Sequence, residues 1–199
     1  MSKTKILNSK EGYKITADYY DKKVSYWDSF EKDMILPLLG NLEDKKILDI
    51  GAGTGRLSER MVKNGAEVFA LDISKEMLDK IRTKKVKKII GDAENLDFSD
   101  DSFDIIVATF LIVHLKDPTR FFDEVYRVLK PDGKFLLTNI NQRKAPAVKT
   151  AQGLIEIESY YHRPDYVLEK LESMAFGVDT EKFVYEGENW INQIILLSK

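Results

Sequence analysis

The chain has 199 residues, with 31 Lys or Arg against 33 Asp or Glu and no Cys. This length suits one domain with a sizeable core, and the formal net charge of −2 gives no global electrostatic reason to expect nucleic acid or an anionic membrane as a partner. The lack of Cys excludes disulfides, thiolate nucleophiles and zinc–thiolate sites. With only two histidines, His114 and His162, we predict no metal site.

The sequence shows no targeting segment. Its longest apolar run is far shorter than the ~20 residues needed to span a bilayer, and the basic N-terminal stretch lacks the apolar core of a signal peptide. We therefore expect a soluble, cytoplasmic protein.

Short β-rich runs alternate with helical patterns along most of the chain. The runs predicted to be strands are Lys46–Ile50, Glu67–Leu71, Lys87–Ile90, Asp104–Phe110, Lys134–Ile140, Lys182–Glu186 and Trp190–Leu197. Helices are predicted over Arg56–Asn64, from the N-cap Ser74 through Ile81, from the N-cap Asp117 through Leu129, and over Asp165–Ala175. Before them, Lys14 to Leu39 is predicted to be a helical segment rich in aromatic residues.

This alternation predicts the α/β fold class. Strands joined through helices need crossover connections, so the sheet is mostly parallel and helices cover both of its faces. Only Gly187, Glu188 and Asn189 separate the last two strands, which is too few for a crossover. We therefore expect a doubly wound seven-stranded sheet, mostly parallel, with one antiparallel strand in a C-terminal hairpin.

A glycine-rich loop follows the first predicted strand and precedes a helix. Gly51, Gly53 and Gly55 alternate in this loop, where glycine permits positive φ and a close approach of a ligand to the backbone. The helix beyond supplies unpaired N–H groups at its start. Asp72 ends the next strand roughly 20 residues later, where an acid can accept the hydroxyls of a ribose. The pattern is compatible with any ligand that contains adenosine.

Two residues argue against a nicotinamide dinucleotide in this site. The dinucleotide fingerprint needs a third glycine where the chain has Arg56. Asp49, directly before the loop, would repel a pyrophosphate and suits a ligand with a cationic amine. An equally good explanation of Asp49 is a hydrogen bond that stabilises the loop, and the two roles are compatible.

The run LDIGAGTGR, Leu48–Arg56, followed by LDIS at Leu71–Ser74, resembles the class I S-adenosylmethionine-dependent methyltransferases, and Gly91 to Thr138 looks like the rest of that family's core. The resemblance implies a Rossmann-like fold, S-adenosyl-L-methionine as cofactor and S-adenosyl-L-homocysteine as product. The cofactor-binding residues that it implies are Asp49, Gly51, Ala52, Gly53, Thr54, Gly55, Asp72, Ile73, Met77, Asp92, Ala93, Glu94, Thr109 and Phe110.

With this resemblance, we expect residues 1–199 to form one methyltransferase domain. It would consist of an N-terminal helical cover segment (1–40), a cofactor-binding core (45–140), a substrate cover (141–163), and a last helix and hairpin (164–199). No repeat, low-complexity tract or linker interrupts the sequence between these parts.

Methyl transfer is an in-line displacement in which the cofactor supplies the electrophile, so the enzyme needs few catalytic side chains. His114 and His162 are the candidate bases, because the unperturbed pKa of histidine lies near operating pH; a structural role is the alternative for His114. The candidate substrate-binding residues are Tyr13, Tyr19, Tyr20, Tyr160, Tyr161 and Arg163. The same aromatic and basic residues are also suited to packing the cover segments on the sheet.

A small-molecule acceptor, methylated on O, N or C, is the predicted substrate of a monomer or homodimer. The sequence Thr109-Phe110-Leu111-Ile112 lacks the Asn/Asp-Pro-Pro-Tyr/Phe pattern of amino-methylating enzymes that act on adenine or glutamine. The alternatives are a protein or carrier-bound substrate, a non-catalytic S-adenosylmethionine-binding regulator, and a nicotinamide-dependent oxidoreductase.

We expect Asn8 to Tyr20 to act as a lid that becomes ordered when the cofactor binds. Deletion of residues 1–30 should therefore abolish methyl transfer, measured as turnover of the correct acceptor. Unchanged turnover would contradict the lid.

Overall fold

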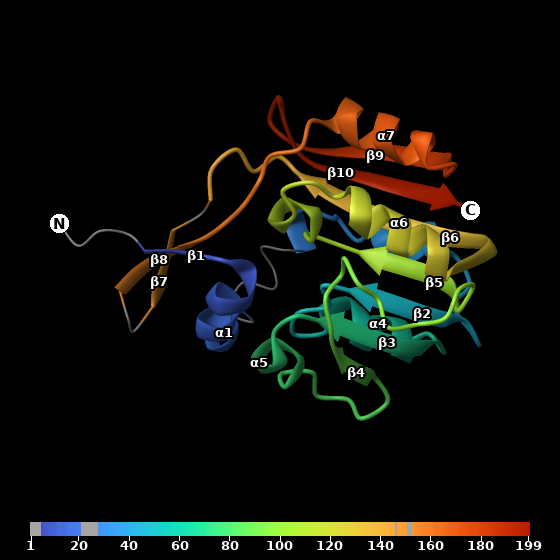
Figure 1. The fold of residues 1–199 in the computed structure, drawn as a ribbon, viewed down its shortest axis with the longest axis horizontal. Helices are drawn as coiled ribbons and strands as arrows, with labels where there is room; N and C mark the ends of the chain where they lie inside the picture. Colours follow the sequence, from blue (N-terminus) through green and yellow to red (C-terminus); the bar gives the residue numbers. More distant parts are fainter. Residues whose placement is uncertain (1–4, 21–27, 146, 151–152) are drawn as a thin grey trace.

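The computed structural model describes residues 5–20, 28–145, 147–150 and 153–199. A seven-stranded sheet forms the centre, in the order β4-β3-β2-β5-β6-β10-β9 (Figure 1). Its strands are β2 (Lys46–Ile50), β3 (Glu67–Asp72), β4 (Lys87–Ile90), β5 (Phe103–Ala108), β6 (Leu129–Ile140), β9 (Gly177–Glu186) and β10 (Asn189–Ser198). Strand β10 is antiparallel to both β6 and β9, and the other pairs are parallel. The predicted fold class and C-terminal hairpin are confirmed.

Helices cover both faces of this sheet. One face packs against α6 (Thr119–Val128) and α7 (Pro164–Ser173), and the other against α3 (Ile35–Leu39), α4 (Arg56–Lys63) and α5 (Lys75–Leu78). Within β5, Ile106 faces α6 and Ile105 faces the opposite layer, and both are buried. Strands buried on both faces read as continuous apolar runs, which is the pattern from which they were predicted.

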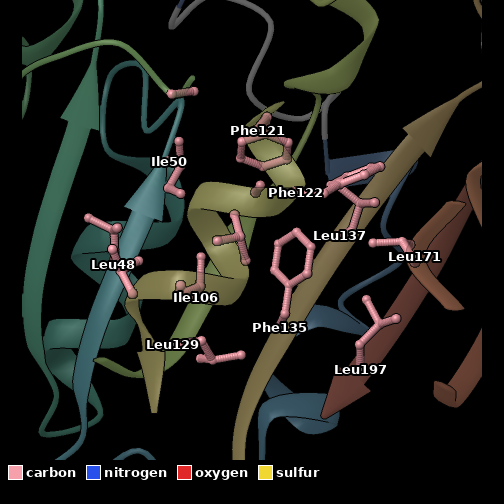
Figure 2. Packing of buried hydrophobic residues seen from close by; sticks show 14 of the residues in the cluster. Leu48, Ile50, Ile106, Phe121, Phe122, Leu129, Phe135, Leu137, Leu171 and Leu197 are labelled. Carbon is pink, nitrogen blue, oxygen red and sulfur yellow. The ribbon is translucent and has the colours of Figure 1, made fainter. Parts of the chain in front are cut away.

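Aromatic residues fill the layer between the sheet and α6. Phe121 and Phe122 of α6 and Phe135 of β6 have no exposed surface, and Figure 2 shows them packed beside Leu137 and Leu171. The rings of Phe121 and Phe135 meet edge to face, with centroids 6.1 Å apart. This rigid layer holds the carboxyl ends of β5 and β6 in place.

A second, three-stranded sheet was not predicted from the sequence. Strand β1 (Lys5–Leu7) pairs in parallel with β8 (Gly153–Ile157), which pairs antiparallel with β7 (Ala147–Thr150). The N-terminal cover segment is therefore not wholly helical, because it begins with a strand. The small sheet thus joins the expected N-terminal cover segment (1–40) to the expected substrate cover (141–163).

Helix α1 (Ser9–Tyr20) follows β1 and lies beside the carboxyl ends of the parallel strands (Figure 1). A Cβ atom on Gly12 would lie only 2.6 Å from Cγ1 of Ile157, so the helix backbone fits closely against β8. On its other side α1 meets the α5 region, through an ion pair between Asp18 and Lys80 and a contact of 3.7 Å between Lys14 and Glu76.

Several predicted boundaries differ from the structure. Helix α5 ends at Leu78 rather than Ile81, and α6 ends at Val128 because Leu129 already belongs to β6. Strand β5 ends at Ala108, two residues before Phe110. None of the helices described is long and apolar enough to cross a membrane.

Gly12→Leu should separate α1 from β8, because the new side chain would occupy the space of Ile157. Hydrogen exchange of residues 9–20 and 153–157 should rise by at least about tenfold, while the seven-stranded sheet keeps its protection. Lys10→Leu, on the exposed surface of the same helix, is the control. Equal exchange in the two variants would show that the close contact does not hold α1.

Candidate functional site

One pocket lies where the carboxyl ends of β2, β3, β4 and β5 meet, and it encloses about 670 Å³ of empty space including its open mouth. Strand β2 has β3 on one side and β5 on the other, so the pocket lies at the point where the strand order reverses, which is the usual ligand site of such sheets. The lining residues are Ser9, Tyr13, Tyr20, Gly51, Gly53, Leu71, Asp72, Ile73, Met77, Gly91, Asp92, Ala93, Thr109, Phe110, Leu111, His114 and Leu115.

The glycine loop forms one wall of the pocket. Gly51, Gly53 and Gly55 have φ values of 71°, 56° and 82°, a region that favours glycine. The N–H groups of Gly51 and Ala52 both donate to the carbonyl oxygen of Leu71, at 2.8 and 3.0 Å. These bonds tie the loop to the end of β3, so the backbone that faces the pocket is held before a ligand arrives.

Asp72 holds the loop from the opposite wall. Its Oδ2 accepts from the N–H of Gly53 at 2.8 Å and its Oδ1 from the N–H of Ser74 at 2.9 Å. Burial raises the pKa of this carboxyl above its usual value, although hydrogen bonds from the backbone N–H groups of Ser74, Gly53 and Ile73 oppose the shift. The carboxylate lines the pocket and can accept a further hydrogen bond there.

Asp49 lies beneath the loop rather than in the pocket wall. It is 2% exposed, and its Oδ2 accepts from the hydroxyl of Ser58 at 2.5 Å, which connects the end of β2 to α4. Burial raises the pKa of Asp49 to about 6. Within the described part of the structure, the hydrogen-bond partner of Asp49 is thus a side chain of α4 and not the backbone of the glycine loop.

Arg56 occupies the position where a dinucleotide fingerprint would have glycine. Its guanidinium forms two parallel hydrogen bonds of 2.7 Å to the carboxylate of Glu31, which is 2% exposed, and a third of 2.8 Å to Asp28. The Phe30 ring meets the Phe110 ring at 6.0 Å. These contacts fix the segment after residue 27 against the pocket, and the sequence analysis did not find Glu31 or Asp28.

The end of β5 turns sharply into the pocket. Phe110 has a φ of 58°, an unusual value for a residue with a large side chain, and its N–H donates to Oγ1 of buried Thr138 at 2.9 Å. This turn places Thr109 and Phe110 in the pocket wall. Strained backbone of this kind is often found at functional sites.

Tyr13 and His114 meet across the pocket, although 101 residues separate them. The hydroxyl of Tyr13 lies 2.7 Å from Nε2 of His114, and Nδ1 of His114 lies 3.0 Å from the carbonyl oxygen of Glu158. Helix α1, the turn Ile112–His114 and the segment after β8 are therefore joined at one point. Tyr20 stacks edge to face on Tyr13, with centroids 6.0 Å apart.

His162 does not line the pocket. It is buried, and its Nε2 lies 2.9 Å from the carbonyl oxygens of both Ile112 and Leu115. Carbonyl oxygens only accept, so Nε2 carries a hydrogen and holds the turn that presents His114.

Of the other predicted residues, Ile73, Met77, Asp92 and Ala93 line the pocket. Those that lie outside the pocket lining, like His162 and Asp49, are Ala52, Thr54, Gly55, Glu94, Tyr160, Tyr161 and Arg163. Tyr161 instead packs near Trp190, and Arg163 pairs with Asp165. The side chain of Tyr19 lies outside the described part of the structure. The pocket also has lining residues that the sequence analysis missed, namely Ser9, Leu71, Gly91, Leu111 and Leu115.

Comparisons with known proteins find similarity to one family. The family model described as a methyltransferase domain matches residues 48–137, from within β2 to within β6. This part of the chain is therefore similar to methyltransferase domains. Because the glycine loop, Asp72 and the end of β5 all lie in the matched range, this part contains most of the pocket.

A sequence relative and a solved structure are similar to this chain. A demethylmenaquinone methyltransferase from Clavibacter sepedonicus is 35% identical over 115 residues, which are 55% of this chain and 47% of the relative; the chain thus spans about half the length of that relative. A protein from Pyrococcus horikoshii OT3 superposes with a TM-score of 0.76 at 24% identity, over 95% of this chain and 98% of the other.

A third comparison concerns the cofactor of the family. The magnesium protoporphyrin IX methyltransferase from Synechocystis PCC 6803, solved with bound S-adenosylmethionine, superposes with a TM-score of 0.70 at 15% identity, over 91% of this chain and 84% of the other. Members of the methyltransferase family use S-adenosylmethionine.

Asp49→Asn should stabilise the protein at neutral pH, measured without added ligand. A carboxyl with a folded-state pKa of about 6 and an ordinary value of 3.8 loses folding stability as the pH rises from 3.8 to 6, by up to ~3 kcal/mol. The asparagine has no such cost. The free energy of unfolding of Asp49→Asn should exceed that of the wild type by the largest amount above pH 6, and the difference should vanish towards pH 4.

Denaturant unfolding at several pH values measures this difference, with exposed Asp97→Asn as the control. A difference between wild type and Asp49→Asn that does not depend on pH would contradict the assigned burial cost.

Proposed function

We propose that this chain transfers the methyl group of S-adenosyl-L-methionine to a small-molecule acceptor. The observation that carries the proposal is the buried Asp72 carboxylate, held by the N–H groups of Gly53 and Ser74 at the wall of a pocket that the glycine loop completes. The printed name of the relative from Clavibacter sepedonicus, a demethylmenaquinone methyltransferase, supports a small molecule as the acceptor.

The lining of the pocket suits the chemistry of the cofactor. A Cβ atom on Gly51 would lie 3.1 Å from the side chain of Leu111, so a larger residue at position 51 would crowd this wall of the pocket. The adjacent oxygens of Asp72 suit the two ribose hydroxyls, while Ile73 and Met77 offer apolar surface to the adenine ring.

The residues of the chain would bind and orient the reactants. Once bound, the cofactor supplies a methyl group on positively charged sulfur. The glycine loop, with the carboxylate of Asp49 beneath it, would hold the amino acid portion of the cofactor. Asp92 would accept from the adenine amine, and Thr109 and Phe110 would lie near the reacting centre. Helix α1 would exclude water and hold the acceptor in line, which alone provides much of a rate enhancement.

Asp72→Ala should weaken binding of S-adenosylhomocysteine, because the ribose hydroxyls lose their acceptors. A loss on the order of 1–3 kcal/mol corresponds to a roughly 5- to 150-fold higher Kd by calorimetry. Asp179→Ala, exposed on β9, is the control. An unchanged Kd would refute the ribose role, and tight binding of NAD without binding of S-adenosylhomocysteine would refute the proposed cofactor site.

A screen of a metabolite pool with a labelled methyl donor tests the reaction itself. We expect label in a low-molecular-weight product that depends on active protein. Binding of S-adenosylhomocysteine together with label only in protein would favour a protein substrate, and binding without any transfer would favour a regulatory protein.

A further inference from the structure

The hydrogen bond between Tyr13 and His114 has a defined direction. The carbonyl oxygen of Glu158 only accepts, so Nδ1 of His114 carries the hydrogen in their 3.0 Å contact. In the neutral imidazole Nε2 is then an acceptor, and the hydroxyl of Tyr13 donates to it at 2.7 Å. The backbone thus fixes the tautomer and leaves the basic nitrogen aimed at Tyr13.

The surroundings keep both partners neutral in the resting protein. Burial raises the pKa of Tyr13 well above its usual value, and nearby Tyr20 and Asp72 raise it further. Burial also lowers the pKa of His114 below 6.5, although its bond to Glu158 opposes the shift. The other titratable side chain in the pocket lining is Asp92. At neutral pH, His114 is therefore an unprotonated base beside a protonated hydroxyl.

The Tyr13–His114 pair lies in the same pocket as the residues expected near the reacting centre. Both rings line the pocket together with Thr109 and Phe110 at the end of β5, and they meet edge to face with centroids 5.2 Å apart. The hydroxyl oxygen of Tyr13 donates its own hydrogen to His114 and keeps an acceptor site for a second group. A methyl acceptor that carries a proton could donate a hydrogen bond to this oxygen.

We propose that Tyr13 is a catalytic residue, which takes the proton of the methyl acceptor and passes its own hydroxyl proton to His114. The inference rests on the proposed function and narrows the substrate class to acceptors whose nucleophilic atom carries a proton, such as a phenol, a hydroquinone or an amine. His114 acts through Tyr13, and the carbonyl of Glu158 positions His114.

The transfer balances in atoms and charge. The X–H bond of the acceptor breaks, and its electron pair forms the new X–CH₃ bond, while the pair of the old carbon–sulfur bond stays on sulfur. The acceptor proton moves to Oη of Tyr13 as the Tyr13 proton moves to Nε2 of His114. One positive charge is lost at sulfur and one appears on the imidazolium, so the pocket keeps its net charge. The lowered pKa of His114 then favours release of that proton to water.

Tyr13→Phe removes the hydroxyl and keeps the ring that packs in the pocket. With a panel of phenols, hydroquinones and amines as acceptors, kcat should fall about 10²- to 10⁴-fold, while the Kd for S-adenosylhomocysteine changes less than about threefold. The wild-type rate should rise with pH through the pKa of His114 and then level off. The rising part of this pH profile should be absent in Tyr13→Phe. Tyr166→Phe, exposed on α7, should behave as wild type.

His114→Asn keeps a donor for Glu158 and removes the acceptor for Tyr13. This variant should lower kcat as much as Tyr13→Phe does. The double variant should lower kcat no further than either single variant, because the two residues act as one unit. Fully additive losses, or a Tyr13→Phe enzyme with more than half the wild-type kcat and an unchanged pH profile, would overturn the relay.

Nitrogen NMR of His114 gives a readout that needs no acceptor. We expect the tautomer with hydrogen on Nδ1, and a change in the Nε2 shift and in the pKa of His114 in Tyr13→Phe but not in Tyr166→Phe. An unaltered His114 signal would overturn the proposal even if the protein binds S-adenosylhomocysteine. Failure to bind that ligand with the expected His114 signal would instead contradict the proposed function.

Discussion

The pocket depends on the hydrogen bonds of the Asp72 carboxylate, which connect the ends of two neighbouring strands. One oxygen holds Gly53 of the loop after β2 and the other holds Ser74 at the start of α5, so a single buried group sets the distance between two neighbouring strand ends. Desolvation of this carboxylate, and of Asp49 below the loop, raises both pKa values. The ligand-free protein thus maintains two carboxylates at a cost in stability, which a ligand with hydroxyl and ammonium groups would offset.

The second constraint is the small sheet that positions α1. Strand β1 alone is three residues long with only Leu7 buried, so its position depends on pairing with β8 and on the bond from the N–H of Glu158 to the carbonyl of Leu7 at 2.8 Å. Glu158 also accepts from His114. One residue therefore links the small sheet to the pocket, and movement of α1 would alter the surroundings of His114.

The sequence predicted what local pattern and spacing determine. Buried strands such as Lys46–Ile50, the left-handed glycines and the acid at Asp72 follow from rules that act within a few residues or one strand–helix unit. The small sheet was missed because β1 and β8 pair across about 150 residues, and neither has a strong pattern of its own. The hydrogen bonds between Arg56 and Glu31 and between Tyr13 and His114 were also missed, because each joins residues from different elements that no local pattern relates. Tyr13 and His114 were each singled out by residue type. The sequence could not reveal that His162 supports the turn rather than the pocket.

The central claim is that this pocket binds an S-adenosyl ligand through its desolvated carboxylates. Calorimetry of S-adenosylhomocysteine binding near pH 6, in buffers of different ionisation enthalpy, measures the protons exchanged on binding. Hydrogen bonds and positive charge from the ligand would lower the raised pKa values of Asp49 and Asp72, so the account predicts net proton release near pH 6 that fades above pH 8. Tight binding without proton release, or no binding of S-adenosylhomocysteine, would contradict it.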